Sequence, residues 1–299
     1  MKRPALTLLS LATLVVAVVV LAFGLAACGG DGAGGSTPTA TVTVTATPTV
    51  EPTGEPGATM TVSLYFLRGE TLGVAHRAVP ATGAPATAAM NVLLAGPDTR
   101  ERAAGLGTTI PDGVVLHGIV IDSETKIATV DLGDRFAAGD GALSLRARVA
   151  EVVYTLTQFP TVRSVRFLID GEPDVPLGGE GLLLEKPQTR AGNRDLLPAI
   201  FVESPAVGDV ISDPRLTLRG SASVFEATFV AEVLDTTGEV VADKTVTARV
   251  GAPGRGGFVT RVSLPMLTGK GKLVVYEVSM ADGSRMNEVR IPLRFAIQD

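Results

Sequence analysis

The chain has 299 residues, which is room for about two domains of ordinary size. Hydrophobic residues make up 45% of the sequence and charged residues 19%, as is usual for a protein that folds. Acidic residues outnumber basic ones by 31 to 26, there is no dense basic run and Trp is absent, so the composition argues against a nucleic-acid partner, which needs clustered cations and stacking aromatics.

Residues 1–27 are predicted to be a signal peptide. Lys2 and Arg3 give a positively charged start, and residues 8–25 are almost entirely apolar, the pattern that the secretion machinery reads. The run ends in Leu25-Ala26-Ala27-Cys28, which resembles the lipobox of bacterial lipoproteins. The resemblance implies cleavage before Cys28 and lipid attachment to its sulfur, with fatty acyl chains such as palmitate anchoring the protein. The alternative is an uncleaved transmembrane helix, because an apolar run of this length could span a bilayer.

Residues 28–59 are predicted to be a disordered tether that begins at the lipidated cysteine. They are rich in Thr, Pro and Gly and lack large apolar side chains, so they cannot offset the entropy lost on ordering. A flexible coil of about 30 residues spans roughly 30 Å, and about 90 Å if it is extended as polyproline II. The density of Thr and Pro would also permit O-glycosylation.

Residues 60–190 are predicted to form an α+β domain, a small sheet with helices packed on one face. Alternating apolar and β-branched residues predict the strands, and an apolar face at helical spacing, with a proline after its end, predicts the longer helix. The predicted strands span residues 61–67, 74–79, 114–122, 126–132 and 162–169, and the predicted helices span residues 85–94 and 143–158.

Several runs in this segment, in order, resemble the GerMN domain of sporulation and germination proteins. They are Leu93-Leu94-Ala95-Gly96-Pro97, residues 101–106, Thr109-Ile110-Pro111, Val130-Asp131-Leu132, residues 155–160 and residues 165–171. The resemblance implies a fold similar to the ring-building modules of secretion-type assemblies and makes a homo-oligomer an open alternative. It brings no catalytic residues.

Residues 198–299 are predicted to form an immunoglobulin-like β-sandwich, because short strands recur between turn signals without a helical period. The predicted strands span residues 199–202, 215–220, 227–235, 240–248, 257–264, 272–279 and 290–296. Runs that include Ser204-Pro205-Ala206, Gly220-Ser221-Ala222 and residues 224–227 resemble the Gmad-type immunoglobulin-like domain of bacterial spore germination. At Gly256-Gly257-Phe258 the family usually has a Trp that this chain lacks.

Catalytic chemistry finds little support in the sequence. His76 and His117 are the only histidines, they fall in different predicted strands, and no Gly-x-Ser-x-Gly motif is present. A zinc site would need three or four clustered ligands, so we expect no catalytic set, no metal and no cofactor. The run Gly178-Gly179-Glu180-Gly181 lacks the Lys and the helix of a phosphate-binding loop.

Two acidic groups leave calcium binding open as an alternative. They are Asp131, Asp134 and Asp140 around two glycines, and Asp170, Glu172 and Asp174 after a predicted strand. Calcium prefers several carboxylates on a tight loop, but neither group has EF-hand spacing, and Asp-Gly is ordinary turn chemistry. Paired carboxylates could also cleave glycosidic bonds, although the absence of Trp argues against a sugar site.

The sequence therefore predicts a non-enzymatic binding or scaffold module, lipid-anchored on the extracytoplasmic side of the cell membrane. An envelope protein or the cell wall is the expected partner, and a role in sporulation or germination follows only from the family resemblance. The alternative is a cell-wall-active enzyme or a ligand-sensing accessory that uses the acidic loops. A rise in melting temperature with Ca²⁺ would favour that alternative.

Overall fold

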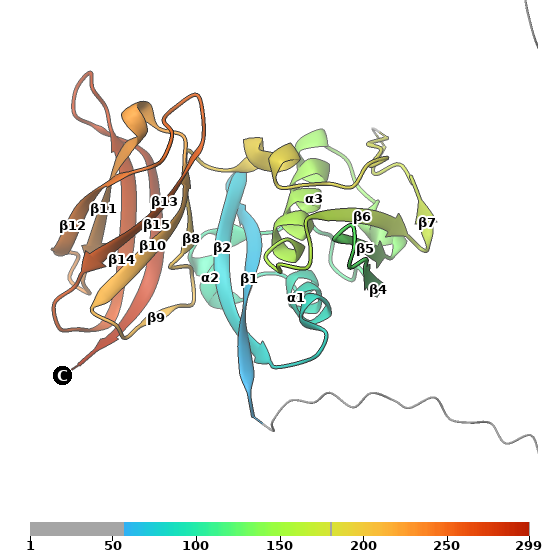
Figure 1. The fold of residues 1–299 in the computed structure, drawn as a ribbon, viewed down its shortest axis with the longest axis horizontal. Coiled ribbons are helices and arrows are strands. Elements are labelled where there is room, and N and C mark those ends of the chain that lie inside the picture. The colour runs from blue at the N-terminus through green and yellow to red at the C-terminus, as the bar shows by residue number, and fades with distance from the viewer. Residues whose placement is uncertain (1–56, 180, 299) are drawn as a thin grey trace, which may run out of the picture. The chain divides into compact units, whose positions relative to one another are not determined.

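The computed structural model describes residues 57–179 and 181–298 (Figure 1). The predicted signal peptide, Cys28 and nearly all of the predicted tether lie outside the described residues. Among the described residues, no helix combines the length and the apolar character needed to cross a membrane.

The first sheet is built on a β-hairpin. Strands β1 (Thr59–Arg68) and β2 (Thr71–Pro80) pair antiparallel over their full length, with Leu67 opposite Leu72, and β3 (Leu106–Gly107) pairs with the end of β1. The hairpin turn uses Gly69 at φ +62°, a conformation that glycine adopts at little cost. Both strands predicted in this region, residues 61–67 and 74–79, are confirmed. Each strand in the structure extends beyond its predicted range at both ends.

The second sheet has the order β4-β5-β6-β7. It contains β4 (Leu116–Ile121), β5 (Ile127–Leu132), β6 (Ser164–Ile169) and β7 (Glu172–Pro173). The antiparallel β4–β5 pair is formed by the predicted strands 114–122 and 126–132. Strands β5 and β6 are parallel, so a crossover must join them. That crossover is the predicted long helix, α3 (Ala142–Leu156).

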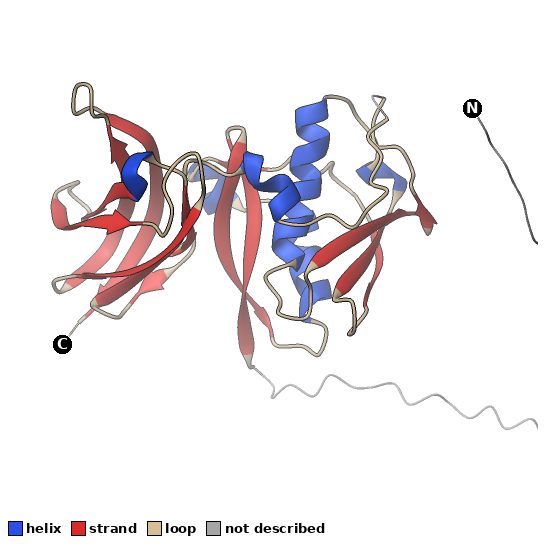
Figure 2. Ribbon diagram, turned by 45° about the horizontal axis from the view of Figure 1, so that its top comes forward, coloured by secondary structure: helices blue, strands red, loops and turns tan. Residues whose placement is uncertain are grey.

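Helices α1 (Pro85–Leu94) and α3 contact strands of both sheets (Figure 2). The α+β class is therefore confirmed, but the prediction of one sheet is wrong, because the strands divide into two sheets. Gln158, two residues beyond the end of α3, occupies part of the free edge of β1. Gln158 accepts from the Ser63 N–H at 2.8 Å and donates to the Ser63 carbonyl at 2.8 Å, so at this point no further strand can pair with β1.

The short helix α2 (Thr99–Ala103) was not predicted. Its start is a capping box: Asp98 accepts from the Glu101 N–H at 2.8 Å, and the Glu101 carboxylate accepts from the Asp98 N–H at 2.7 Å. Glu101 is buried and also forms an ion pair with Arg77 of β2. The pair ties the helix to the first sheet.

The second half of the structure is a β-sandwich, as predicted. One sheet has the order β13-β10-β8, with β13 (Gly256–Ser263), β10 (Arg215–Ala222) and β8 (Ile200–Ser204). The other has the order β12-β11-β14-β15-β9, with β12 (Val240–Thr247), β11 (Thr228–Leu234), β14 (Leu267–Val278), β15 (Arg285–Ile297) and β9 (Val210–Ile211). Between the sheets, the rings of Phe229 and Phe258 meet edge to face, with centroids 4.9 Å apart. They supply aromatic core area in a domain that contains no Trp.

Three 3-10 helices connect these elements: η1 (Asp134–Phe136), η2 (Ala191–Leu196) and η3 (Phe225–Ala227). The second lies just before the sandwich, and the third leads into β11.

Candidate functional site

His76 is part of a contact between the first sheet and the sandwich. Its Nδ1 lies 2.8 and 3.0 Å from the two carboxylate oxygens of Asp209, which belongs to the loop after β8. The His76 backbone N–H donates to the Val207 carbonyl at 2.8 Å, and Ala75 and Val207 form a parallel β-bridge. The imidazole therefore holds two parts of the fold together.

His117 lies at the surface of the second sheet. Its Nε2 is 2.9 Å from the Asp170 carboxylate, and both side chains are substantially exposed. Asp170 and Gly171 form the turn between β6 and β7 at φ 50° and 82°, and Asp131 accepts from the Gly171 N–H at 2.9 Å. The structure thus brings together members of the two predicted acidic groups, Asp131 and Asp170, around a turn.

The other predicted acidic positions also serve local structure. Asp134 begins η1, and Asp140 accepts from the Gly179 N–H at 3.3 Å. Over residues 57–179 and 181–298, no three or more His, Cys, Asp or Glu side chains are grouped so that they could hold a metal ion. Glu180 of the glycine-rich run lies outside these ranges.

A charged cluster surrounds Arg190, which was not singled out in the sequence. Its guanidinium donates to Glu203 of β8 at 2.7 Å, to the Tyr65 hydroxyl at 3.0 Å and to the Thr157 hydroxyl at 2.8 Å. It also lies over two rings, 5.1 Å from the centroid of Tyr65 and 4.8 Å from that of Tyr154. Burial raises the pKa of Tyr65, so the phenol stays protonated and donates to Glu203 at 2.9 Å.

An apolar cluster lies beside these charges. Tyr65 and Tyr154 contact Phe201 of β8, with ring centroids 6.2 Å apart in both pairs. Leu72, Val74, Ala150, Leu196 and Ala206 complete the buried set. We call this set, together with Arg190 and Glu203, the junction.

A polar hollow of ≈ 460 Å³ opens at the junction. Its lining comes from both halves of the structure: Ser63, Tyr65, His76, Thr157, Gln158, Arg190, Glu203 and Arg219. The side chains of Arg190 and Glu203 are 33% and 27% exposed, so solvent reaches both charges. We call this space the junction hollow.

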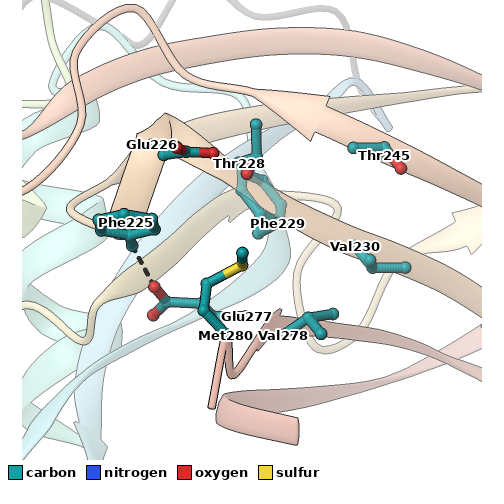
Figure 3. Close-up of a pocket in the computed structure, with 9 residues that line it drawn as sticks. All are labelled: Phe225, Glu226, Thr228, Phe229, Val230, Thr245, Glu277, Val278 and Met280. Carbon is teal, nitrogen blue, oxygen red and sulfur yellow. Dashed lines mark hydrogen bonds between the residues drawn. The ribbon is translucent and has the colours of Figure 1, made fainter. Parts of the chain in front are cut away.

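A second hollow, of ≈ 200 Å³, lies at one end of the five-stranded sheet (Figure 3). Phe225, Val278 and Met280 at its border are 57%, 42% and 77% exposed. The backbone of the Phe225 loop is fixed, because the Phe225 N–H donates to the buried Glu277 carboxylate at 2.7 Å, the bond drawn in Figure 3. Glu226 and Ala227 follow at φ 51° and 61°, an uncommon conformation for residues with a side chain. We call this apolar site the Phe225 surface.

Two family models match the chain in order. Residues 63–175 match the sporulation and spore germination model named Germane, and residues 199–284 match the immunoglobulin-like domain of bacterial spore germination, Gmad2.

The chain carries a GerMN-type domain followed by a Gmad-type domain. This confirms the family prediction for both halves. No curated protein matches the chain.

Several solved structures resemble parts of the chain. The first GerMN domain of the sporulation protein GerM from Bacillus subtilis is 18% identical, and the match covers 44% of this chain and 98% of that one, with a TM-score of 0.35. The tandem GerMN domains of the same protein are 14% identical over 68% of this chain and 61% of theirs, with a TM-score of 0.38. A candidate lipoprotein from Clostridium perfringens is 20% identical over 46% of this chain and 93% of that one, with a TM-score of 0.34.

The junction lies partly outside both family matches. Arg190 and Leu196 fall between residue 175, where the GerMN match ends, and residue 199, where the Gmad match begins. No family pattern covers residues 176–198, so the sequence gives no signal for side chains there whose partners lie far away along the chain. The Phe225 surface lies inside the Gmad match, on residues quoted above only for their family likeness.

Proposed function

We propose that this chain is a lipid-anchored, extracytoplasmic binding module of the cell envelope, acting in sporulation or germination by docking on a partner protein. The proposal keeps the sequence-based division of the chain: signal peptide 1–27, tether 28–59 from lipidated Cys28, GerMN domain 60–190 and Gmad domain 198–299. The names of the two matched domains support the process, and the lipobox supports the location.

The exposed aromatic ring of Phe225 is the main observation that supports docking of a protein partner. Phe225 is 57% exposed and Met280 77% exposed beside one hollow. Aromatic residues and Met are enriched where proteins bind one another, and grouped exposed apolar side chains mark such sites. The loop that presents Phe225 is held by Glu277 rather than free, so little entropy would be lost when a partner binds.

The residues that border the hollow indicate which side chains a partner should present. Glu226 is exposed on the loop next to Phe225 and forms no ion pair among the described residues. A partner segment that places an apolar side chain in the hollow and a Lys or Arg against Glu226 would match both features. We therefore propose a protein partner with a basic residue beside an apolar anchor.

The test is site-specific photo-cross-linking in intact cells, with a photoreactive residue replacing Met280. Val120 of the GerMN domain, which is 71% exposed, is the matched control position. A discrete adduct from position 280 that is absent from position 120, and that Phe225→Ala removes, would support the proposal.

Mislocalised Cys28→Ala protein should lose the adduct. An adduct made equally from both positions, or only with another copy of the chain, would contradict docking of a partner at the Phe225 surface.

A further inference from the structure

The outer face of the three-stranded sheet in the Gmad domain is basic. Along β10, Leu216 and Leu218 are buried in the sandwich, whereas Arg215 and Arg219 alternate with them and are exposed. On the neighbouring strand, Arg261 is exposed and lies opposite Thr217. Residues directly opposite share a face, so the three arginines lie on the same side of the sheet.

These cations are closely spaced. Arg261 is one diagonal step from both Arg215 and Arg219, which corresponds to Cα separations of roughly 7–8 Å. Lys244 of β12 adds a fourth charge, because its ammonium donates to the Arg261 carbonyl at 2.8 Å. We call these four residues the basic face.

Acidic groups neutralise only part of the basic face. Arg215 pairs with Asp213 at 3.4 Å, where both side chains are largely exposed. Within residues 57–179 and 181–298, the side chains of Arg219, Arg261 and Lys244 have no carboxylate within 4.0 Å. Like charges at this spacing repel, and a bound anion would relieve the repulsion.

The basic face leads into the junction hollow, because Arg219 belongs to both. Inside the hollow, Glu203 is already compensated by Arg190 at 2.7 Å and by the Tyr65 hydroxyl at 2.9 Å. The Nδ1 of His76 faces Asp209, and its other ring nitrogen makes no hydrogen bond among the described residues. The hollow therefore brings polar side chains of the GerMN domain next to Arg219 of the Gmad domain, a guanidinium that has no carboxylate partner among the described residues.

We propose that the basic face and the junction hollow together bind an anionic polymer whose repeating groups are phosphates or carboxylates. Arginine binds either group through two parallel N–H donors. An extended polyanion would place successive charges on Arg261 and Arg219, and an anionic group at its end or bend would enter the hollow. This site is separate from the Phe225 surface and goes beyond docking of a protein partner. The whole chain has a net charge of −5, so the attraction of the polymer is confined to the basic face. Salt screens this attraction.

The experiment measures binding of the full chain, purified in a non-ionic detergent, to fluorescent polyphosphate and to fluorescent polyglutamate across a range of salt concentrations. The test variant is Arg219→Glu with Arg261→Glu. The control is Arg163→Glu with Arg166→Glu, an equal charge reversal at exposed positions of the GerMN domain. Circular dichroism spectra of both variants serve as the control for folding.

We expect the wild-type chain to bind at least one polymer, with affinity that falls as salt rises. The test variant should bind at least 10-fold more weakly, and the control within about threefold of wild type. Binding to polyphosphate alone would identify phosphate as the group, and binding to both polymers would show that any anionic repeat suffices. Equal losses in the two variants, or no binding to either polymer, would overturn the proposal.

Discussion

Glu151 makes the stability of the GerMN domain depend on pH. The residue lies in the middle of α3 and is buried. Burial raises the pKa of Glu151 from its ordinary 4.5 to about 7, although hydrogen bonds from the Thr108 hydroxyl at 2.6 Å and the Thr109 N–H at 3.0 Å act in the opposite direction. The folded state therefore prefers the protonated acid.

The sign and size of the effect follow from linkage. Because the folded pKa is raised, the favourable contribution is fully present below the unfolded pKa of 4.5 and is lost as pH rises through about 7. Each pH unit between the two pKa values is worth about 1.4 kcal/mol, so ionising Glu151 should cost about 3 kcal/mol between pH 4 and pH 8. Against a typical stability of about 5–15 kcal/mol, this change is large.

The assay is urea unfolding of the wild type and Glu151→Gln, followed by circular dichroism at pH 4 and pH 8. Glutamine keeps the shape and can accept from the Thr109 N–H, but it never ionises. The stability of the variant relative to wild type should therefore rise by about 3 kcal/mol from pH 4 to pH 8. Exposed Glu124→Gln should change stability by less than about 0.5 kcal/mol at either pH. A difference between wild type and Glu151→Gln that does not depend on pH would refute the reasoning.

Three further predictions concern contacts that hold the fold together. Gly208→Ala should lower the free energy of unfolding by at least about 3 kcal/mol, because φ is +102° and the new Cβ would lie 2.6 Å from the His76 carbonyl oxygen. The control Gly238→Ala, at φ +92° with nothing within 4 Å, should cost only about 1 kcal/mol in the same urea titration. Equal losses in the two variants would contradict the contact between Gly208 and His76. Gln158→Leu leaves a backbone N–H and carbonyl of β1 without partners and should cost about 2 kcal/mol, with faster amide exchange in β1 as the specific readout. Arg190→Met removes the ion pair to Glu203 and two ring contacts, so chymotrypsin should cut near residues 196–197 at least several-fold faster, and an unchanged cleavage rate would count against the junction.

The sequence predicted those elements whose signals are local. Helix α1 begins and ends at the predicted residues, because Pro85 suits the first turn and Gly96, at φ +74°, follows the end. The turn between β6 and β7 also has a local signal, because Asp170-Gly171 is a dipeptide typical of turns. The five-residue helix α2 is too short to show a period, although its Asp98-x-x-Glu101 capping box was a readable signal.

The junction and both hollows could not be predicted in this way. Tyr65 and Glu203 are 138 residues apart in sequence, and no local pattern records such a contact. The separation of the two sheets depends on Gln158 and Thr155, whose polar side chains replace a neighbouring strand along β1. The sequence places His76 in a strand, but its hydrogen-bond partner, Asp209, lies in the other domain and 133 residues away along the chain.

The parallel bridge between Ala75 and Val207 has a consequence for how this protein can be divided. Cutting the chain between residues 196 and 199 would expose the buried side chains of Tyr65, Leu72 and Val74 on one fragment and that of Phe201 on the other. Each fragment would then present an apolar surface next to a half-paired strand, a combination that favours aggregation. Recombination that exchanged one domain alone would meet the same penalty, so these two domains should be inherited, expressed and engineered as a pair.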